Sequence, residues 1–228
     1  MVAVLYDVHG NLDALEAVLA DARQAGAERF VLGGDYALFG PHPAATVTRL
    51  RELDATWIRG NGERWTARPD EAPDDHVVLG AIAASRGELG DATVEQLAAL
   101  PEQYAAGAAR YCHGSPPSDV RSFLPEPGGD EDELLAGVHE DRLVFGHTHL
   151  QFRRRSRGGE VELVNPGSVG MPFDGDPRAA YAVVVDDGEV ELRRVSYDHE
   201  RAAASVRERF PGFGETVARR IERAAFVS

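Results

Sequence analysis

Short apolar runs and amphipathic repeats alternate along the first quarter of the chain. Residues 2–6 are apolar without alternation, which predicts a strand buried on both faces. Apolar residues then recur at helical spacing over 12–22. Two further runs, 29–32 and 55–58, predict strands, and a helix is expected to open between them at Pro43. This alternation predicts a parallel sheet whose functional groups lie at the carboxyl ends of its strands.

The middle of the chain is less regular. Residues 75–88 and 93–100 have a helical pattern, and residues 104–112 are expected to be extended. The prolines and glycines within 116–129 predict a surface loop. Residues 143–145 predict another buried strand.

The last third consists of short strand-like runs with turn residues between them. The predicted strands are residues 152–155, 161–164, 181–185 and 190–195. They are separated by Gly159, by Asn165-Pro166-Gly167 and by Asp187-Gly188, which predicts antiparallel hairpins. Helices are expected to close the chain at 198–209 and 215–225. We therefore predict an α/β fold with two sheets, one begun at the N-terminus and one finished at the C-terminus, covered by helices.

Length and charge narrow the choice of partners. The 228 residues, 43% of them hydrophobic, suit one domain over residues 1–228. The formal charge is −14 and every cationic side chain other than histidine is arginine, because the chain has no lysine. So acidic a chain repels a polyphosphate backbone, which disfavours a nucleic-acid polymer as partner. The one arginine cluster, at residues 153–157, is expected to be the solvated face of a hairpin.

Cellular location is predicted from cysteine content and hydropathy. Cys112 is the only cysteine, so no internal disulfide can form, which fits a reducing compartment. The first predicted strand leaves no room for a signal peptide, and no apolar run reaches membrane-spanning length. We expect a cytoplasmic protein without membrane contact.

Polar residues with oxygen or nitrogen ligand atoms stand at or just past the ends of the predicted strands. They are Asp7, His9, Asp35, Asn61, His113, His147 and His149, and five of these seven adjoin a glycine. The two-residue spacing of Asp7 and His9, repeated by His147 and His149, allows both members of each pair to face one point. As caps of strand ends they would not need four histidines, so we predict a metal site.

The ligand chemistry indicates which metals this site would hold. Seven such groups on one sheet edge can hold two divalent cations that share a carboxylate. Hard oxygen and imidazole ligands without thiolate favour manganese, with iron, zinc, cobalt or nickel as alternatives, over calcium or a structural zinc.

The order of these motifs resembles the calcineurin-like metallophosphoesterase superfamily. The matching motifs are Asp7-Val-His9, Gly34-Asp35, Gly60-Asn61, His113-Gly114 and Gly146-His147-Thr-His149. The run from Gly34 to Pro43 and the segment Asn165-Pro-Gly-Ser-Val-Gly-Met-Pro172 are similar to its small bacterial phosphodiesterase branch. The resemblance implies a four-layer α-β-β-α sandwich, with two mixed β-sheets flanked by helices, and a dinuclear metal site.

Roles follow from the resemblance by position. One metal would be held by Asp7, His9, Asp35 and His149, and the other by Asp35, Asn61, His113 and His147, with Asp35 bridging. A hydroxide between the cations would attack phosphorus. The expected catalytic residues are His9, Asp35, Asn61 and His42, and the expected substrate contacts are Tyr36 and Arg64. His42 fits a surface residue at a helix start equally well, and loop packing is the simpler account of Tyr36. For Arg64 an ion pair with Glu63 or a nearby acid is at least an equal alternative.

The chain departs from the family pattern at one position. Many members have a histidine directly after the asparagine, which helps to stabilise the transition state or to protonate the leaving group, and here that residue is Gly62. We therefore expect a preference for acidic leaving groups or strained diesters, with His42 or a metal-bound water as a weak substitute.

The expected function is hydrolysis of a small phosphodiester, such as a cyclic nucleotide. A phosphomonoester or phosphoprotein phosphatase is the alternative, because it would use the same metals with a different mouth. A non-enzymatic scaffold of the same fold is the other class, and retention of all seven ligands argues against it. Hairpin edges could pair two chains into a homodimer.

Overall fold

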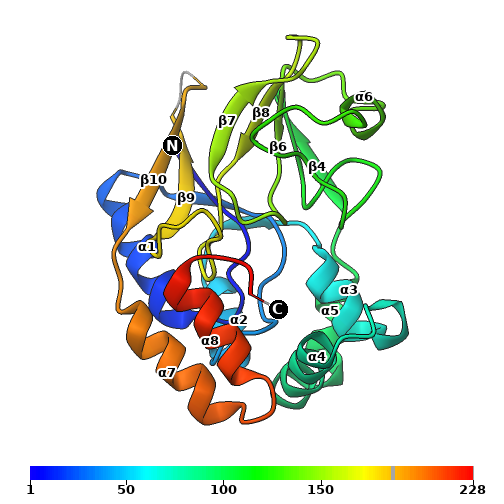
Figure 1. The fold of residues 1–228 in the computed structure, drawn as a ribbon. Helices are drawn as coiled ribbons and strands as arrows, with labels where there is room; N and C mark the ends of the chain where they lie inside the picture. The colour runs from blue at the N-terminus through cyan, green and yellow to red at the C-terminus, as the bar shows by residue number, and fades with distance from the viewer. Residues whose placement is uncertain (186–187, 228) are drawn as a thin grey trace.

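Two five-stranded β-sheets face each other at the centre of the molecule (Figure 1). The computed structural model describes residues 1–185 and 188–227. Its strands are β1 Val2–Leu5, β2 Arg29–Leu32, β3 Ala55–Trp57, β4 Gln103–Ala106, β5 Ala109–Cys112, β6 Arg142–Val144, β7 Phe152–Arg155, β8 Glu162–Asn165, β9 Ala179–Val184 and β10 Val190–Val195. Its helices are α1 Leu12–Gln24, α2 Pro43–Leu50, α3 Asn61–Ala67, the 3-10 helix η1 Pro69–Glu71, α4 His76–Leu89, α5 Asp91–Ala98, α6 Glu131–Leu134, α7 His199–Arg209 and α8 Gly214–Arg223.

Both sheets are mixed, as predicted. The first has the order β10-β9-β1-β2-β3. In it β1, β2 and β3 are parallel, and β9 runs antiparallel to both of its neighbours, β1 and β10. The second has the order β4-β5-β6-β8-β7, with β5, β6 and β8 parallel. In each sheet the parallel strands therefore end at one common edge.

Four layers of apolar packing confirm the predicted sandwich. Val4 and Tyr6 of the first sheet meet Tyr111 and Val144 of the second, and the Tyr6 hydroxyl donates to the Val144 carbonyl (3.1 Å). The opposite face of β1 packs on the apolar stripe of α1. Beyond the second sheet the outer layer is thin, because it consists of the short helix α6 and the loop before it.

The last two helices pack against α4 rather than against a sheet. Val206 of α7 and Val217 and Ile221 of α8 form one apolar cluster with Val77 and Ile82 of α4. Figure 1 shows α7 and α8 side by side next to α1, with the chain end returning toward the middle of the molecule. None of the helices in the described ranges is long and apolar enough to cross a membrane.

Two predictions about the strands are wrong. Residues 104–112 are not one extended segment but the hairpin of β4 and β5, which turns at Gly107 with a positive φ of 57°. The C-terminal strands do not finish the second sheet. Instead, β9 lies beside β1 and is buried on both faces, so Asn165-Pro166-Gly167 carries the chain from one sheet to the other. Part of the predicted turn at Asp187-Gly188 lies outside the described residues.

Candidate metal centre

The carboxyl ends of strands from both sheets bring all seven predicted ligands to one place. Asp7 follows β1, Asp35 follows β2, Asn61 follows β3, His113 follows β5, and His147 and His149 follow β6. Six of the seven are buried and His147 is half-buried. The ligands follow strand ends as predicted, but they come from the carboxyl edges of two sheets that meet here rather than from one sheet edge.

Asp7 is at the centre of the cluster. Its Oδ1 lies 3.5 Å from His149 Nε2, 3.8 Å from His9 Nε2 and 3.8 Å from His113 Nε2. Asp7 belongs to two groups of potential ligand atoms. One group adds His9 and His149, and the other adds Asp35 and His113. Within each group the ligand atoms lie within 4.8 Å of one another.

Asp35 reaches toward both groups. Its Oδ1 lies 3.5 Å from His113 Nε2, and its Oδ2 lies 3.9 Å from His9 Nε2. This position is compatible with a bridging carboxylate, and the bridging role itself stays a prediction.

Asn61 and His147 complete the side of the cluster next to His113. The side-chain amide of Asn61 places one atom 2.9 Å from His147 Nδ1 and 2.9 Å from His113 Nε2. With the amide oxygen in this place, Asn61 Oδ1, His147 Nδ1 and His113 Nε2 are three potential ligand atoms that converge on one point.

A buried atom without a partner indicates what the cluster would hold. Asp7 Oδ2 accepts a hydrogen bond from the His147 backbone N–H (3.0 Å), but the buried Oδ1 has no donor among the described residues. A buried carboxylate oxygen without a donor is costly. Three imidazole nitrogens face this oxygen, so a divalent cation fits the donor set.

Backbone carbonyls fix three of the imidazoles. The Nδ1 atoms of His9, His113 and His149 lie 3.0, 2.8 and 2.6 Å from the carbonyl oxygens of Leu38, Gly33 and Met171. A proton on each Nδ1 leaves the Nε2 lone pair directed at the cluster, which is how ligating histidines are commonly oriented.

Backbone conformation singles out the same positions. Seven non-glycine residues of the described chain have positive φ, and five of them are predicted ligands: Asp7, His9, Asp35, His147 and His149. Positive φ is rare outside glycine and costs about 1–3 kcal/mol at each residue. Such strain persists where the surrounding structure enforces it, and it typically clusters at functional sites.

Burial and charge set the protonation of the cluster. Burial, and then the neighbouring imidazole of His149, lowers the pKa of His9 to about 3, and burial with His113 lowers the pKa of His147 to about 4. Both therefore keep free lone pairs at neutral pH. Burial opposes ionisation of Asp7, but the surrounding imidazoles outweigh it and lower its pKa.

Two other members hold protons more firmly. Burial raises the pKa of Asp35 to about 7, and the charges of Glu63 and Asp7 add to this rise against the effect of His113. For His113, burial favours the neutral form, yet the carboxylates of Asp35 and Asp7 prevail and raise its pKa. A cation would have to displace these protons.

Glu63 is a positioning residue that we did not predict. Its carboxylate is buried and accepts from the backbone N–H groups of Asp35 (2.9 Å), Gly60 (2.8 Å) and Tyr36 (2.8 Å). It therefore ties the loop after β2 to the start of α3. The available signal was an acidic residue three positions after Gly60, an offset typical of helix N-termini.

Gly62 lies directly against Asp35. Its N–H donates to Asp35 Oδ1 (2.7 Å), and a Cβ at this position would lie 2.8 Å from the same oxygen. A side chain at position 62 would therefore press directly on the Asp35 carboxylate.

Tyr36, a predicted substrate contact, and His42, a predicted catalytic residue, do not line the cavity at the cluster. Tyr36 is fully buried, and its hydroxyl bonds to the carbonyls of Leu32 and Ile58, so the structure does not support contact with a substrate. His42 lies half-buried before α2 and does not line the cavity at the cluster.

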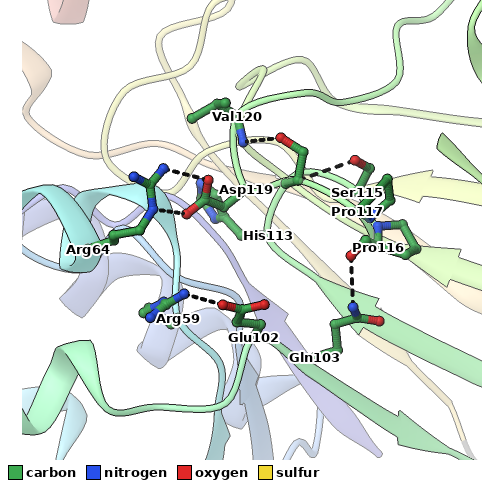
Figure 2. A pocket seen from close by; sticks show the side chains of 11 residues that line it. Arg59, Arg64, Glu102, Gln103, His113, Ser115, Pro116, Pro117, Asp119 and Val120 are labelled. Carbon is green, nitrogen blue, oxygen red and sulfur yellow. Dashed lines mark hydrogen bonds and ion pairs between the residues drawn. The ribbon is translucent and has the colours of Figure 1, made fainter. Parts of the chain in front are cut away.

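Arg64 is committed to carboxylates. Its Nε and Nη2 donate to Asp119 (2.7 Å each) and its Nη1 to Glu71 (2.9 Å), so the predicted ion pair exists with acids other than Glu63. Figure 2 shows Arg64 turned toward Asp119 in a cavity of about 310 Å³ that His113 also lines. Arg59 bonds to Glu102 in the same cavity.

A second cavity opens on the other side of the cluster. It has a volume of about 330 Å³ and includes His9, Asp35, Asn61, His147 and His149 in its wall. The rest of its lining is mostly apolar and aromatic, with Phe39, Trp65, Phe173 and Phe226. We did not predict Trp65, Phe173 or Phe226 here, because single aromatic residues in the sequence carry no sign of a shared cavity.

Known proteins resemble this chain over most of its length. A sequence model of the calcineurin-like phosphoesterase superfamily domain matches residues 1–188. The uncharacterised protein MJ0912 of Methanocaldococcus jannaschii is 29% identical over 233 residues, covering 92% of this chain and 94% of that protein. The phosphodiesterase YfcE of Escherichia coli K12 is 29% identical over 198 residues, covering 79% of this chain and 85% of that protein.

A solved structure extends the agreement to the whole fold. The metallophosphoesterase from Sphaerobacter thermophilus superposes with a TM-score of 0.84 at 27% identity and covers 98% of both chains. Because the family model matches residues 1–188, most of the chain, this protein belongs to the calcineurin-like phosphoesterase superfamily.

Proposed function

We propose that this chain is a phosphodiesterase that works with two divalent cations. The observation that carries the proposal is Asp7 Oδ1, a buried oxygen without a donor among the described residues that faces the Nε2 atoms of His9, His113 and His149. Such a set stabilises a cation and has no evident use without one.

The cluster divides into two ligand sets that share Asp35. Asp7, His9, Asp35 and His149 would hold one cation, and Asp35, Asn61, His113 and His147 would hold the other. The division is supported by the two oxygens of Asp35, one nearer His113 and one nearer His9. Manganese suits these hard ligands, and iron, zinc, cobalt or nickel are the alternatives.

When bound, the cations would activate a water molecule and offset negative charge on the phosphoryl oxygens. The chain's own groups prepare the site. Carbonyl contacts hold three imidazoles with Nε2 inward, and Glu63 holds the Asp35 loop, so little reorganisation is needed at the moment of reaction.

The cavity of about 330 Å³ beside the cluster favours a small diester. This volume is near the lower end for small-molecule sites, which suits a cyclic nucleotide or an aryl diester better than a polymer. Its apolar wall offers a place for an organic substituent of the ester. The name of YfcE, a phosphodiesterase, supports the same assignment.

A panel of esters tests the proposal. Manganese-loaded protein should hydrolyse a 2′,3′-cyclic nucleotide or bis(4-nitrophenyl) phosphate at least about tenfold faster than 4-nitrophenyl phosphate or a phosphopeptide, and chelation should abolish the activity. Faster turnover of the monoester or phosphopeptide would assign a phosphatase instead. Activity that survives complete removal of metal would reject the metal-dependent mechanism.

A further inference from the structure

Arg220 is a buried cation that the proposed reaction does not yet use. It is 6% exposed, the only arginine in the buried class among the described residues. Its Nε donates to the Val227 carbonyl (2.7 Å), but within residues 1–185 and 188–227 its two Nη atoms have no hydrogen-bond acceptor and no carboxylate lies within ion-pair distance. The arginines near the cluster behave differently, since Arg59 and Arg64 both pair with acids.

Arg220 lines the same cavity as the candidate metal ligands. A series of ring contacts connects the two ends of this cavity. The Phe173 ring stacks on the His149 imidazole (centroids 4.4 Å apart, planes at 23°) and meets the Phe226 ring edge-on (5.8 Å, 81°). The Arg220 guanidinium covers the other part of Phe226, 4.5 Å from its centroid.

Three contacts hold Arg220. Helix α8 packs through Val217 and Ile221 into the cluster with α4, Nε donates to the Val227 carbonyl, and Cζ lies over the ring of Phe226, which is itself 68% exposed. A planar guanidinium on an aromatic ring keeps its outer N–H groups directed away from that ring. The Nη donors are therefore preorganised for a ligand.

Electrostatics favours an anion as that ligand. Arginine keeps its charge in proteins, and the two Nη donors of Arg220 line the cavity without an acceptor among the described residues. Among the described residues, Asp75, also in the cavity wall, is the one acid whose charge acts on Arg220, but it lies beyond ion-pair distance and its Oδ1 already caps α4 through Val77 and Val78. An anionic group from a ligand would supply the missing acceptor.

We infer that Arg220 binds a second anionic group of the substrate, carried by the organic substituent of the ester, while Phe173 and Phe226 contact the apolar part of that substituent. This inference rests on the proposed function. It names the substrate class as phosphoesters whose substituent combines a planar apolar group with a carboxylate or a further phosphate.

Calorimetric titration of manganese-loaded protein tests this without turnover. The probes are phenylphosphonate, 4-carboxyphenylphosphonate and 1,4-phenylenediphosphonate. Wild-type protein should bind each doubly functional probe about tenfold tighter than phenylphosphonate, a typical gain for a charge-assisted hydrogen bond. A preference for the carboxylate or for the second phosphonate identifies which anion the site takes.

Variants on α8 separate charge from folding. Arg220→Gln should remove the tenfold difference, and Arg220→Lys should retain part of it because the charge remains. Arg223→Gln, an exposed position on the same helix, should leave the ratio unchanged. Equal affinities of all three probes for wild-type protein, or a ratio unaltered in Arg220→Gln, would overturn the inference.

Hydrolysis distinguishes this failure from failure of the proposed function. Phenyl 4-nitrophenyl phosphate and its 4-carboxyphenyl analogue are compared as substrates. Equal turnover of both contradicts only the role of Arg220. Tighter binding of the charged probes without hydrolysis of any diester contradicts only the diesterase assignment.

Discussion

The carboxylate of Glu63 holds the backbone of Asp35, whose N–H donates to Glu63 Oε2 over 2.9 Å. The same carboxylate accepts from Gly60 and Tyr36, so one buried side chain fixes the ends of two parallel strands relative to each other. The metal cluster thus depends on a residue that touches none of its proposed cations.

Replacing Glu63 should damage both stability and metal affinity. Glu63→Ala leaves three buried N–H groups without an acceptor, and we expect a loss of about 3 kcal/mol in the free energy of unfolding. Glu63→Gln, which keeps one acceptor oxygen, should lose about half as much. Urea denaturation of the two variants measures the loss in the free energy of unfolding.

Glu16→Ala is the matched control, because its pairing with Arg49 is at the surface and should change stability by less than about 1 kcal/mol. A Glu63→Ala protein as stable as this control would show that the loop holds without the carboxylate.

Gly62→Ala should weaken metal binding. Alanine in the first turn of α3 gains less than the ~1 kcal/mol of helix propensity found in a helix interior, and crowding of the buried Asp35 carboxylate opposes that gain. Its Cβ, however, would lie 2.8 Å from Asp35 Oδ1, and displacement of that oxygen should weaken metal affinity by about tenfold. Competition with a fluorescent chelator measures the affinity.

Gly87→Ala provides the comparison, because a Cβ there has no atom within 4 Å and the residue lies in α4. Gly87→Ala should gain up to about 1 kcal/mol in the free energy of unfolding and leave the metal affinity unchanged. Equal metal affinity in both variants would mean that Asp35 is not confined by the backbone at Gly62.

Metal affinity should rise with pH. Burial raises the pKa of Asp35 to about 7, and the carboxylates of Asp35 and Asp7 raise the pKa of His113. Below neutrality Asp35 and His113 therefore carry protons that a cation must displace. Affinity should fall by about tenfold per pH unit for each proton released as pH drops from about 7 to 5.5.

Titration calorimetry in two buffers of different ionisation enthalpy counts the protons released. His9 and His147, with pKa values lowered to about 3 and about 4, should contribute none. Affinity independent of pH across this range would contradict the protonation assigned to Asp35 and His113.

Leaving-group acidity should control the rate. Gly62 offers no proton to the departing oxygen, and neither His42 nor Tyr36 lines the cavity at the cluster. Across aryl methyl phosphates whose phenols span about three pKa units, we expect kcat to fall by at least about tenfold toward the less acidic phenols. A flat series would reveal a proton donor.

The cluster could be predicted because its signal is local in the sequence. Each ligand follows a short apolar strand, and parallel strands of one sheet end at one edge, so the pattern implies that Asp7 and Asp35 converge; that His113 joins them from the second sheet depends on how the sheets pack. The positive φ values could not be placed from the sequence, because Asp and His adopt a left-handed backbone more often than other non-glycine residues but still only rarely.

What the sequence could not predict is where distant elements pack. Tyr36 was expected at the mouth, but its hydroxyl satisfies the carbonyls of Leu32 and Ile58 in the core. The pattern of α8 predicts a helix without indicating its neighbour, so Arg220 and Phe226 could not be placed beside His149. The final hairpin joined β1 because β9 is apolar on both faces.

Asp35→Asn is the variant that tests the central claim most directly, with manganese per chain measured by elemental analysis alongside diester hydrolysis. Wild-type protein should carry about two manganese ions per chain, and Asp35→Asn should carry one or fewer and lose at least about a hundredfold in kcat. A variant that retained two metals and full hydrolysis would contradict the shared site.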